Sequence, residues 1–485
     1  MKICLITSEC EPYVKTGGLA DVCGSLPPAL SNFGAEIKVF LPLYGIINRE
    51  KFIIKPVSGI KQVSLKLGEK EFKFSVYNCK HTDGKTEVYF IECAGLYDRD
   101  SIYTQDSDED ERFILFQYAV FLTLQNLQWA PDVFHCNDWQ SGLIPALLKL
   151  KFNRDKLFTS AATVLSIHNI GYQGIFGKES IYKANFPESS FVLGGPFEYN
   201  GNTNFLKAGI WYADLITTVS KTYAEEIQTS EYGSGLDGVL KSRSDNIAGI
   251  LNGIDNNLWN PVTDNLISEN YGIDNIRLKE KNKVELLELA GLRYSEHIPV
   301  YGIVSRFAWQ KGFELFFDTI DEILDNNIQL IVLGSGEEHY EDFFLKVSLQ
   351  YSDKVYVRFG FDNRFAHLIT AGSDFFVMPS RYEPCGLNQM YSLNYGTIPI
   401  VRKTGGLADT VIDFGNNESG NGIVFDDFLP EQLLVSMKRA EELFIDKPLF
   451  DKVRRSGMSA DFSWERSALQ YMNIYNKVKK PVSGT

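Results

Sequence analysis

The sequence predicts an α/β protein made of two doubly wound domains, each with a parallel sheet between layers of helices. Strand-like and helix-like segments alternate along the chain, and the pattern restarts after about residue 250. Alternating elements favour parallel sheets, because parallel strands are joined by crossover helices. At roughly 150 residues per domain, the length of 485 residues suggests about three domains, that is, two large ones or three ordinary ones. We expect a first domain over 1–250, a second over 251–461, and a C-terminal helix over 462–485 that packs back on the first domain.

The first half opens with a short apolar segment, residues 2–7, which is expected to be a buried strand. The turn that follows it opens a helix at GGLADVCG. Three short strands over 60–93 are separated by polar turns and predict an insertion of antiparallel character. The other elements expected in this half are a helix over 113–127 and strands over 36–44, 131–138, 163–169 and 214–220.

The second half repeats the alternation after a linker over 251–261, which is rich in Asn, Gly and Pro. A helix is expected over 314–327, and the last helix over 462–478 is predicted by apolar residues at helical spacing. The strands expected here are 299–306, 328–336, 355–361, 374–380 and 397–406.

The composition is globular and acidic. The chain has 48 Lys and Arg against 62 Asp and Glu, a formal net charge of −14. This field repels nucleic acid and anionic membranes, so an anionic ligand needs a local cluster of cations. The seven scattered cysteines without a CxxC pair are typical of a reducing compartment. The N-terminal apolar run is short for a signal peptide, and no run reaches the roughly 18 residues of a membrane span, so we expect a cytoplasmic protein.

The heptapeptide KTGGLAD occurs twice, at 15–21 and 403–409, each time between an expected strand and an expected helix. One interpretation is coincidence, or a packing requirement shared by two similar turns. The other is a pair of glycine turns, one on each domain, whose unpaired N–H groups bind an anion at a helix N-terminus. In the first copy, Gly17 would let a ligand approach the backbone, and Lys15 could reach a phosphate.

Two further motifs carry charge at the ends of expected strands. SRFAWQKG places Arg306 and Lys311 where open α/β sheets bind ligands, and two cations there suit a diphosphate. Solvated loop charges are the alternative interpretation. Glu383 lies between a strand and a helix, where it either orients sugar hydroxyls or only meets the helix dipole.

Two motifs of the first half, HCNDWQSG and IHNIGYQG, end strands with His, Asn and Asp side chains, among them Asp138 and His168. Single histidines are often core residues, but two such clusters favour a site for a polyhydroxyl ligand. The chain lacks P-loop, HExxH and zinc-ligand patterns, and Gly334 and Gly336 form an incomplete dinucleotide motif.

In this order and spacing, the motifs resemble those of bacterial glycogen synthase and plant starch synthase, the α-1,4-glucan glucosyltransferases that use ADP-glucose. The resemblance runs from KTGGLAD through LKAGIWYADLITTVS, ILNGIDNNLWNP, SRFAWQKG and PSRYEPCGLNQ to RKTGGLADTV. It implies a GT-B fold, with two Rossmann-like domains facing across a deep cleft. It also implies a retaining transfer of glucose from ADP-glucose to the non-reducing end of an α-1,4-glucan, either glycogen or a malto-oligosaccharide, without a cofactor or a metal.

The resemblance implies catalytic roles for five residues. Lys15 would contact the diphosphate side of the donor, and Arg306 and Lys311 would neutralise the departing ADP. Glu383 would hold the sugar hydroxyls, and His168 would lie against the glucose and help to stabilise positive charge at the anomeric carbon. The implied substrate-binding residues are Glu9, Gly17, Gly18, Asp21, Asp138, Asn252, Phe361, Cys385, Gly386, Leu387, Thr404, Gly405 and Gly406.

Three positions depart from the family or from its relatives. Phe361 occupies the place of a tyrosine that stacks on the adenine, and Asn137 replaces a second histidine found in many bacterial members. Tyr391 stands where related nucleotide-sugar transferases carry a second glutamate, which favours the glycogen and starch synthase branch.

The chemistry expected is electrostatic. No carboxylate pair is evident near the sugar motifs, so a carboxylate nucleophile fits less well than a same-face route. In that route the diphosphate leaves, and a phosphate oxygen takes the proton of the entering hydroxyl. The alternatives are another GT-B glucosyltransferase that uses UDP-glucose, a phosphorylase with pyridoxal phosphate, and an inactive glucan-binding protein. The oligomeric state is not predicted.

Overall fold

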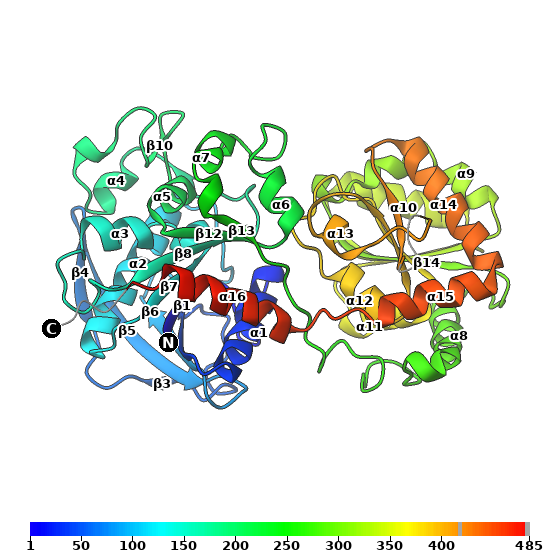
Figure 1. Cartoon of the computed structure of the whole chain (residues 1–485), viewed down its shortest axis with the longest axis horizontal. Coiled ribbons are helices and arrows are strands. Elements are labelled where there is room, and N and C mark those ends of the chain that lie inside the picture. The colour runs from blue at the N-terminus through cyan, green and yellow to red at the C-terminus, as the bar shows by residue number, and fades with distance from the viewer. Residues whose placement is uncertain (416–419, 481–485) are drawn as a thin grey trace. The chain divides into compact units, whose positions relative to one another are not determined.

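The computed structural model describes residues 1–415 and 420–480. The chain divides into two compact units (Figure 1). Unit 1 comprises Met1–Val219, Ala224–Ile250 and the C-terminal segment from Trp464, and unit 2 comprises Ser220–Tyr223 and Leu251–Ser463.

The first half of the chain forms one large sheet and a small one. Its strands are β1 (Lys2–Ile6), β2 (Glu36–Pro42), β3 (Lys55–Pro56), β4 (Val63–Leu67), β5 (Lys70–Lys80), β6 (Glu87–Glu92), β7 (Val133–Asn137), β8 (Ala162–Ile167), β9 (Ile175–Phe176), β10 (Glu198–Tyr199), β11 (Asn202–Asn204), β12 (Leu215–Thr218) and β13 (Ile247–Gly249). Its helices are α1 (Gly18–Asn32), α2 (Glu109–Asn126), α3 (Ile144–Leu150), α4 (Ser180–Lys183), α5 (Phe205–Tyr212), α6 (Lys221–Glu226) and α7 (Asp237–Lys241).

The second half forms a six-stranded sheet in which every strand pairing is parallel. Its strands are β14 (Val300–Phe307), β15 (Gln329–Gly336), β16 (Val355–Phe359), β17 (Phe375–Met378), β18 (Ile398–Arg402) and β19 (Ile423–Phe425). Its helices are α8 (Lys279–Ala290), α9 (Ile320–Asp325), α10 (Glu338–Gln350), α11 (Asn363–Gly372), α12 (Asn388–Asn394), α13 (Gly405–Thr410), α14 (Pro430–Ile445) and α15 (Lys447–Met458).

Both sheets have the doubly wound strand order. In unit 2 the order is β16-β15-β14-β17-β18-β19, and in unit 1 it is β13-β12-β8-β7-β1-β2-β6, with β5 and β3 added beyond β6. The winding therefore reverses between β14 and β17 in unit 2, and between β1 and β7 in unit 1. Open α/β sheets bind ligands outside the carboxyl ends of the strands at such a switch point.

Helices cover both faces of the unit 2 sheet, as the alternation of side chains in β15 shows. Leu330 and Val332 pack into the core that contains α10 and α14, whereas Ile331 and Leu333 pack into the core that contains α8 and α11. Successive side chains of a strand point to opposite faces, so a strand that is apolar throughout must be buried on both sides.

Two expectations differ from the structure. Residues 60–93 are antiparallel only in part, because β6 pairs in parallel with β2 and so belongs to the main sheet, while β3, β4 and β5 form the antiparallel extension. The single helix expected over 314–327 is a short 3₁₀ segment, Phe313–Phe316, followed by the brief helix α9.

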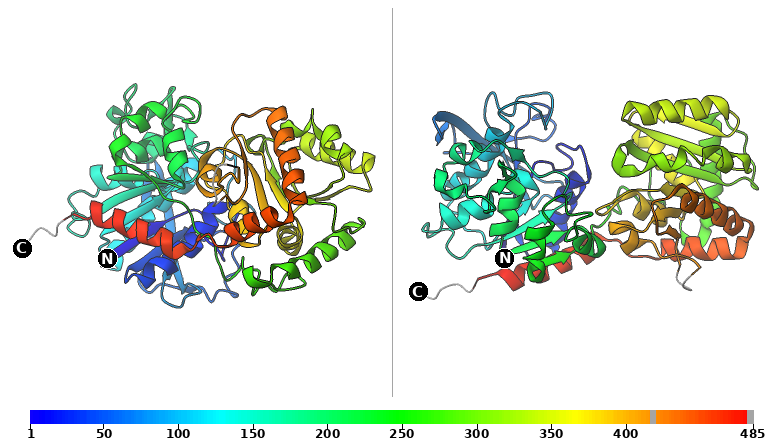
Figure 2. Two further views of the ribbon diagram at one scale, coloured as in Figure 1. Left: turned by 45° about the vertical axis from the view of Figure 1, so that its right-hand side comes forward. Right: turned by 90° about the horizontal axis from the view of Figure 1, so that it is seen from above.

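The last helix, α16 (Trp464–Val478), lies in unit 1 beside α1, as Figures 1 and 2 show. Its Tyr475 hydroxyl is 2.8 Å from His135 Nδ1. Within the described residues, no helix combines the length and the apolar character needed to cross a lipid bilayer.

Candidate functional site

Polar side chains gather at the switch point of each sheet. In unit 1 they follow β1 and β7, and in unit 2 they follow β14 and β17. We describe the two sets separately, beginning with unit 1.

Glu9, just beyond β1, organises the first KTGGLAD turn. Its buried carboxylate accepts hydrogen bonds from Thr16 N at 2.5 Å, Thr16 Oγ1 at 2.7 Å and Gly17 N at 3.0 Å. The N–H groups of Thr16 and Gly17 are therefore engaged by a protein carboxylate. These two amides therefore face Glu9, which supports the turn, and anion binding by the rest of the turn stays a prediction.

Tyr103 is a residue of this site that sequence reasoning missed. It lies in the loop between β6 and α2, and its hydroxyl donates to Glu9 Oε1 at 2.7 Å. Burial, with the Glu9 carboxylate nearby, raises the pKa of Tyr103 well above its usual value, so the hydroxyl remains a donor. Its loop is polar and acidic and carries two tyrosines, Tyr97 and Tyr103, and nothing in the sequence singles out Tyr103 as the site residue.

Lys15 and Asp21 lie together at the start of α1. Lys15 Nζ is 2.6 Å from Asp21 Oδ1 and 3.6 Å from Glu11 Oε1, and 43% of the Lys15 side chain is exposed. Burial raises the pKa of Asp21, and Lys15 opposes that rise. The ammonium group is thus accessible and oriented by acids from its own turn.

Asp138 and His168 meet at the ends of β7 and β8. Asp138 Oδ1 accepts from His168 N at 2.7 Å, and Asp138 has a left-handed backbone, φ +54°. Burial raises the pKa of Asp138 to about 7, with the Glu9 carboxylate adding to the rise, although backbone N–H groups oppose it. Burial lowers the pKa of His168 to about 4, so its imidazole is neutral at pH 7.

Asn137 determines which nitrogen of His168 carries the proton. The Asn137 amide donates through Nδ2 to Ile6 O at 3.0 Å, so its Oδ1, 2.9 Å from His168 Nε2, is the acceptor. His168 therefore has its proton on Nε2. The asparagine that departs from many bacterial relatives fixes the tautomer and connects β7 to β1.

His135 does not join this site. It is fully buried, with Nε2 2.7 Å from Ser166 Oγ and Nδ1 bonded to Tyr475 of α16. Burial lowers the pKa of His135 to about 3. Of the two motif histidines, His135 is a core residue and His168 is a site residue.

Lys311 and Glu383 form the centre of the unit 2 set. Lys311 Nζ is 2.6 Å from Glu383 Oε2, and Ser380 Oγ donates to the same oxygen at 3.1 Å. The two charged side chains are 19% and 7% exposed. Lys311 and Ser380 also line a small hollow, together with Ser305 and Asn388. Arg306, at the end of β14, is exposed.

The second KTGGLAD turn is pressed against the Glu383 loop. Gly406 N donates to Glu383 O at 3.0 Å and to Pro384 O at 3.1 Å. A Cβ on Gly405 would lie 1.9 Å from Glu383 O, and one on Gly406 would lie 2.0 Å from Cys385 O. The expectation that Gly406 offers a free donor to phosphate is therefore wrong, because its amide supports the backbone beside Glu383.

The remaining predicted residues of unit 2 are dispersed around this centre. Asn252 and Cys385 are buried beside each other, and burial raises the pKa of the Cys385 thiol to about 12 although Asn252 hydrogen bonds oppose it. Gly386 has a left-handed backbone and Leu387 precedes α12. Phe361 lies beyond the end of β16 with 92% of its surface exposed, so its face is accessible to a ligand.

Comparisons with known proteins find relatives over nearly the whole chain. Residues 2–242 match the family described as starch synthase catalytic domain, and residues 293–447 match glycosyl transferases group 1. The chain is 43% identical to a glycogen synthase of Koribacter versatilis over 99% of both chains. It is 41% identical to a glycogen synthase of Thermotoga maritima over 98% of this chain and 99% of the other.

Two solved structures share the fold of this chain. The catalytic domain of starch synthase IV from Arabidopsis thaliana, bound to ADP and acarbose, superposes with a TM-score of 0.90 and 31% identity over 98% of this chain and 99% of that chain. A sucrose-phosphate synthase from Thermosynechococcus elongatus, at 18% identity and a TM-score of 0.61, shares the fold.

Proposed function

The chain belongs to the glycogen synthase and starch synthase family of GT-B glycosyltransferases, and we propose that it transfers glucose from ADP-glucose to the non-reducing end of an α-1,4-glucan with retention of configuration. The observation that carries the proposal is the buried Lys311–Glu383 pair at the switch point of unit 2, with Arg306 on the adjoining strand end. We propose that the enzyme is cytoplasmic and that its acceptor is glycogen or a malto-oligosaccharide.

In this proposal, each unit 2 residue contacts a different part of the donor. Lys311 and Arg306 neutralise the charge that develops on the diphosphate as the bond to glucose breaks. Glu383 is an acceptor for glucose hydroxyls, and its bonds to Lys311 and Ser380 keep the carboxylate in one orientation. The exposed Phe361 offers an apolar face to the adenine.

The unit 1 residues supply positioning and further charge. Lys15 contributes a cation to the diphosphate, and Asp138 holds the backbone of His168. A neutral His168 places no positive charge beside the anomeric carbon when positive charge develops there. The same-face route asks the protein for orientation and electrostatic stabilisation, which these residues provide.

Transfer of radiolabel from ADP-glucose and from UDP-glucose to glycogen tests the proposal. We expect incorporation from ADP-glucose, and digestion of the product should release the label from α-1,4 linkages. Incorporation from UDP-glucose alone would establish the alternative donor, and no incorporation from either would overturn the proposal. Near-ultraviolet absorbance of bound pyridoxal phosphate would instead indicate a phosphorylase.

Two variants test the residues. Lys311→Ala should lower turnover by about 10²–10³-fold, as for loss of one charge-stabilising donor. Glu383→Ala should lower turnover while the protein remains folded by circular dichroism. Turnover at the wild-type rate in either folded variant would remove that residue from the proposed mechanism.

A further inference from the structure

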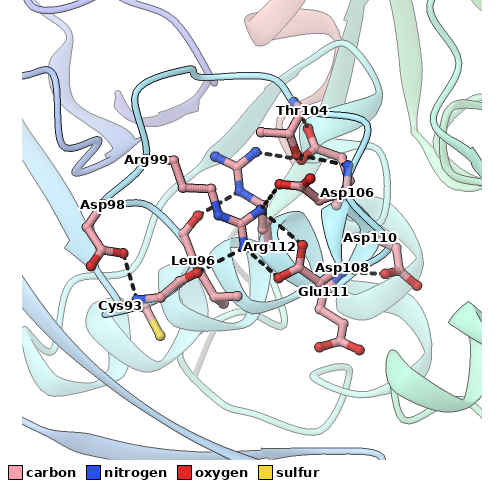
Figure 3. Close-up of polar contacts among 12 residues, drawn as sticks. Cys93, Leu96, Asp98, Arg99, Thr104, Asp106, Asp108, Asp110, Glu111 and Arg112 are labelled. Atoms are coloured by element: carbon pink, nitrogen blue, oxygen red, sulfur yellow. Dashed lines mark hydrogen bonds and ion pairs between the residues drawn. The ribbon is translucent and has the colours of Figure 1, made fainter.

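A buried ion pair between Arg112 and Glu109 lies at the end of the loop that carries Tyr103. Arg112, in the first turn of α2, is 0% exposed, and its Nη1 donates to Glu109 Oε2 at 2.5 Å. Its Nε donates to Leu96 O at 2.7 Å. One guanidinium therefore fixes the beginning of the loop at Leu96 and its end at Glu109. Figure 3 shows Arg112, Leu96 and Thr104 gathered at this point.

The loop continues the connection from Glu109 toward the first KTGGLAD turn. Thr104 donates to Glu109 Oε2 through its hydroxyl at 2.6 Å and to Oε1 through its amide at 3.3 Å. The neighbouring Tyr103 donates to Glu9 Oε1 at 2.7 Å. Glu9 in turn accepts from the amides of Thr16 and Gly17. Every step is a hydrogen bond or a peptide link.

We propose that Arg112 is a positioning residue for glucosyl transfer, acting through Glu109, Thr104, Tyr103 and Glu9 to hold the turn that presents Lys15. We call this chain the Arg112 relay. It rests on the proposed function, because Lys15 is assigned there to the donor diphosphate. None of Arg112, Glu109 and Thr104 is among the residues expected to contact a substrate.

A gain in folding stability does not explain why this ion pair is buried. Burying two charges costs about as much as their attraction returns, and an apolar pair of similar volume is often equally stable. In the described chain, Arg112 Nη2 has no hydrogen-bond partner, and neither has the buried hydroxyl of Tyr44, whose ring centre lies 6.0 Å from Arg112 Cζ. What the arginine supplies is two directional bonds that an apolar side chain cannot make.

The outer charges of the same loop differ from the relay. Arg99 bonds to Asp106 at 2.8 Å and to Asp108 at 2.5 Å, and Asp106 is largely exposed. These pairs connect the loop to itself near solvent, where ion pairs contribute little. Within the described residues, the side chains of Arg99, Asp106 and Asp108 form no hydrogen bond or ion pair with Tyr103 or Glu9, so the inner pair is the one that reaches the turn.

The gentlest test changes Thr104, which is only partly buried. Thr104→Val removes one hydroxyl at nearly constant volume, and Thr104→Ser keeps it. For Thr104→Val we expect about three- to tenfold lower kcat, which corresponds to one hydrogen bond, and faster hydrogen exchange at the amides of Thr16 and Gly17. Thr104→Ser should return both values to near wild type.

The stronger test removes both charges at once, with Arg112→Met and Glu109→Leu in one chain. This double variant leaves no unpaired buried charge, so it should unfold at a temperature near that of the wild type. We expect kcat at least tenfold lower and faster exchange at Thr16 and Gly17. Lys38→Met with Glu87→Leu is the matched control, because the buried Lys38 pairs with the partly exposed Glu87 on β2 and β6, away from the relay.

The outcomes separate the two proposals. Wild-type kcat in folded Thr104→Val and in the folded double variant would overturn the relay, and so would faster exchange without any loss of kcat. If the double variant does not fold, the Thr104 pair decides. A wild-type protein that transfers glucose from no nucleotide sugar would overturn the proposed function, whereas the exchange measurements would still report whether the contacts hold the turn.

Discussion

The two copies of KTGGLAD have the same seven residues and different surroundings. In the first, Lys15 pairs with Asp21 inside the motif, and the Glu9 carboxylate binds the amides of Thr16 and Gly17. In the second, Lys403 pairs with Asp426 outside the motif, at 3.3 Å and with both side chains mostly exposed. The last residue, Asp409, accepts from the amides of Lys221 and Thr222 and from the Thr222 hydroxyl.

The difference follows from the position of each copy in its sheet. The first copy comes directly after β1, a switch-point strand, so its lysine lies among the site residues of unit 1. The second follows β18, one strand removed from the switch point, and its glycines pack against the backbone that carries Glu383. Identical sequences therefore have different surroundings: the first presents an accessible lysine among the candidate site residues, and the second supports the loop that carries Glu383.

Replacing Lys15 and Lys403 by alanine, one at a time, should give the largest difference in activity between the two copies. Lys15→Ala removes a cation from the donor site and should lower kcat/KM for ADP-glucose by about 10²–10³-fold. Lys403→Ala breaks only an exposed ion pair, so its activity should remain within about twofold of the wild type. Steady-state kinetics on both purified variants measures the contrast. Equal losses would mean that the two copies act alike.

Adding a methyl group to one glycine of each copy should separate stability from activity. Gly405 has φ +44° and its Cβ would meet Glu383 O, so Gly405→Ala should destabilise the protein by about 2–3 kcal/mol. Gly17 has an extended backbone, and its Cβ would meet no atom within 4 Å. Gly17→Ala should change the free energy of unfolding by less than about 0.5 kcal/mol.

Thermal unfolding and activity together decide this second contrast. The open space at Gly17 is where a ligand would approach the backbone, so Gly17→Ala should lose activity while it stays folded. Full activity in Gly17→Ala would argue against a ligand there, and an unchanged melting temperature in Gly405→Ala would contradict the packing argument.

The fold could be predicted because its signals are local. Alternating apolar runs such as 299–306 and 328–336 identify buried strands, and their alternation with helices implies parallel sheets. The pairing of β6 with β2 could not be predicted, since partners are chosen by contacts about 50 residues apart. Polar turns on either side of β6 suggested a local hairpin, and β5 does form one with it.

The sequence allowed candidate site residues to be placed at strand ends, but it did not show which contacts they make. Lys311 and Glu383 were expected from their strand ends, and the structure joins them at 2.6 Å. His135 and His168 have similar local sequences, yet Tyr475, 340 residues away, makes His135 a core residue. Likewise, the amides of Gly17 and Gly406 look free in sequence, because their acceptors come from other segments.

A third test concerns Asp138, whose pKa is raised in part by the Glu9 carboxylate that holds the first copy. Burial raises the pKa of Asp138 from about 3.9 in the unfolded chain to about 7. The protonated form is thus favoured by folding, and this stabilisation is complete below pH 4 and is lost as the pH rises through 7. Asp138→Asn cannot titrate, so its free energy of unfolding should fall less than that of the wild type between pH 4 and 8. Parallel urea-unfolding profiles for the two proteins would contradict the assigned pKa.

The two aspartates that end the copies should give the smallest effects. Asp409→Ala removes a carboxylate that accepts three hydrogen bonds at the start of α6, at 2.6, 3.1 and 2.6 Å, and should cost about 1 kcal/mol of stability, as for loss of a helix cap. Asp21→Ala removes only a partner of the half-exposed Lys15, so stability should change by less than about 0.5 kcal/mol. Its KM for ADP-glucose should rise instead, because Lys15 loses the acid that orients it. Chemical denaturation and steady-state kinetics with ADP-glucose should be measured on both variants. If Asp409→Ala changes KM and Asp21→Ala changes stability, the two copies do not differ in the way proposed.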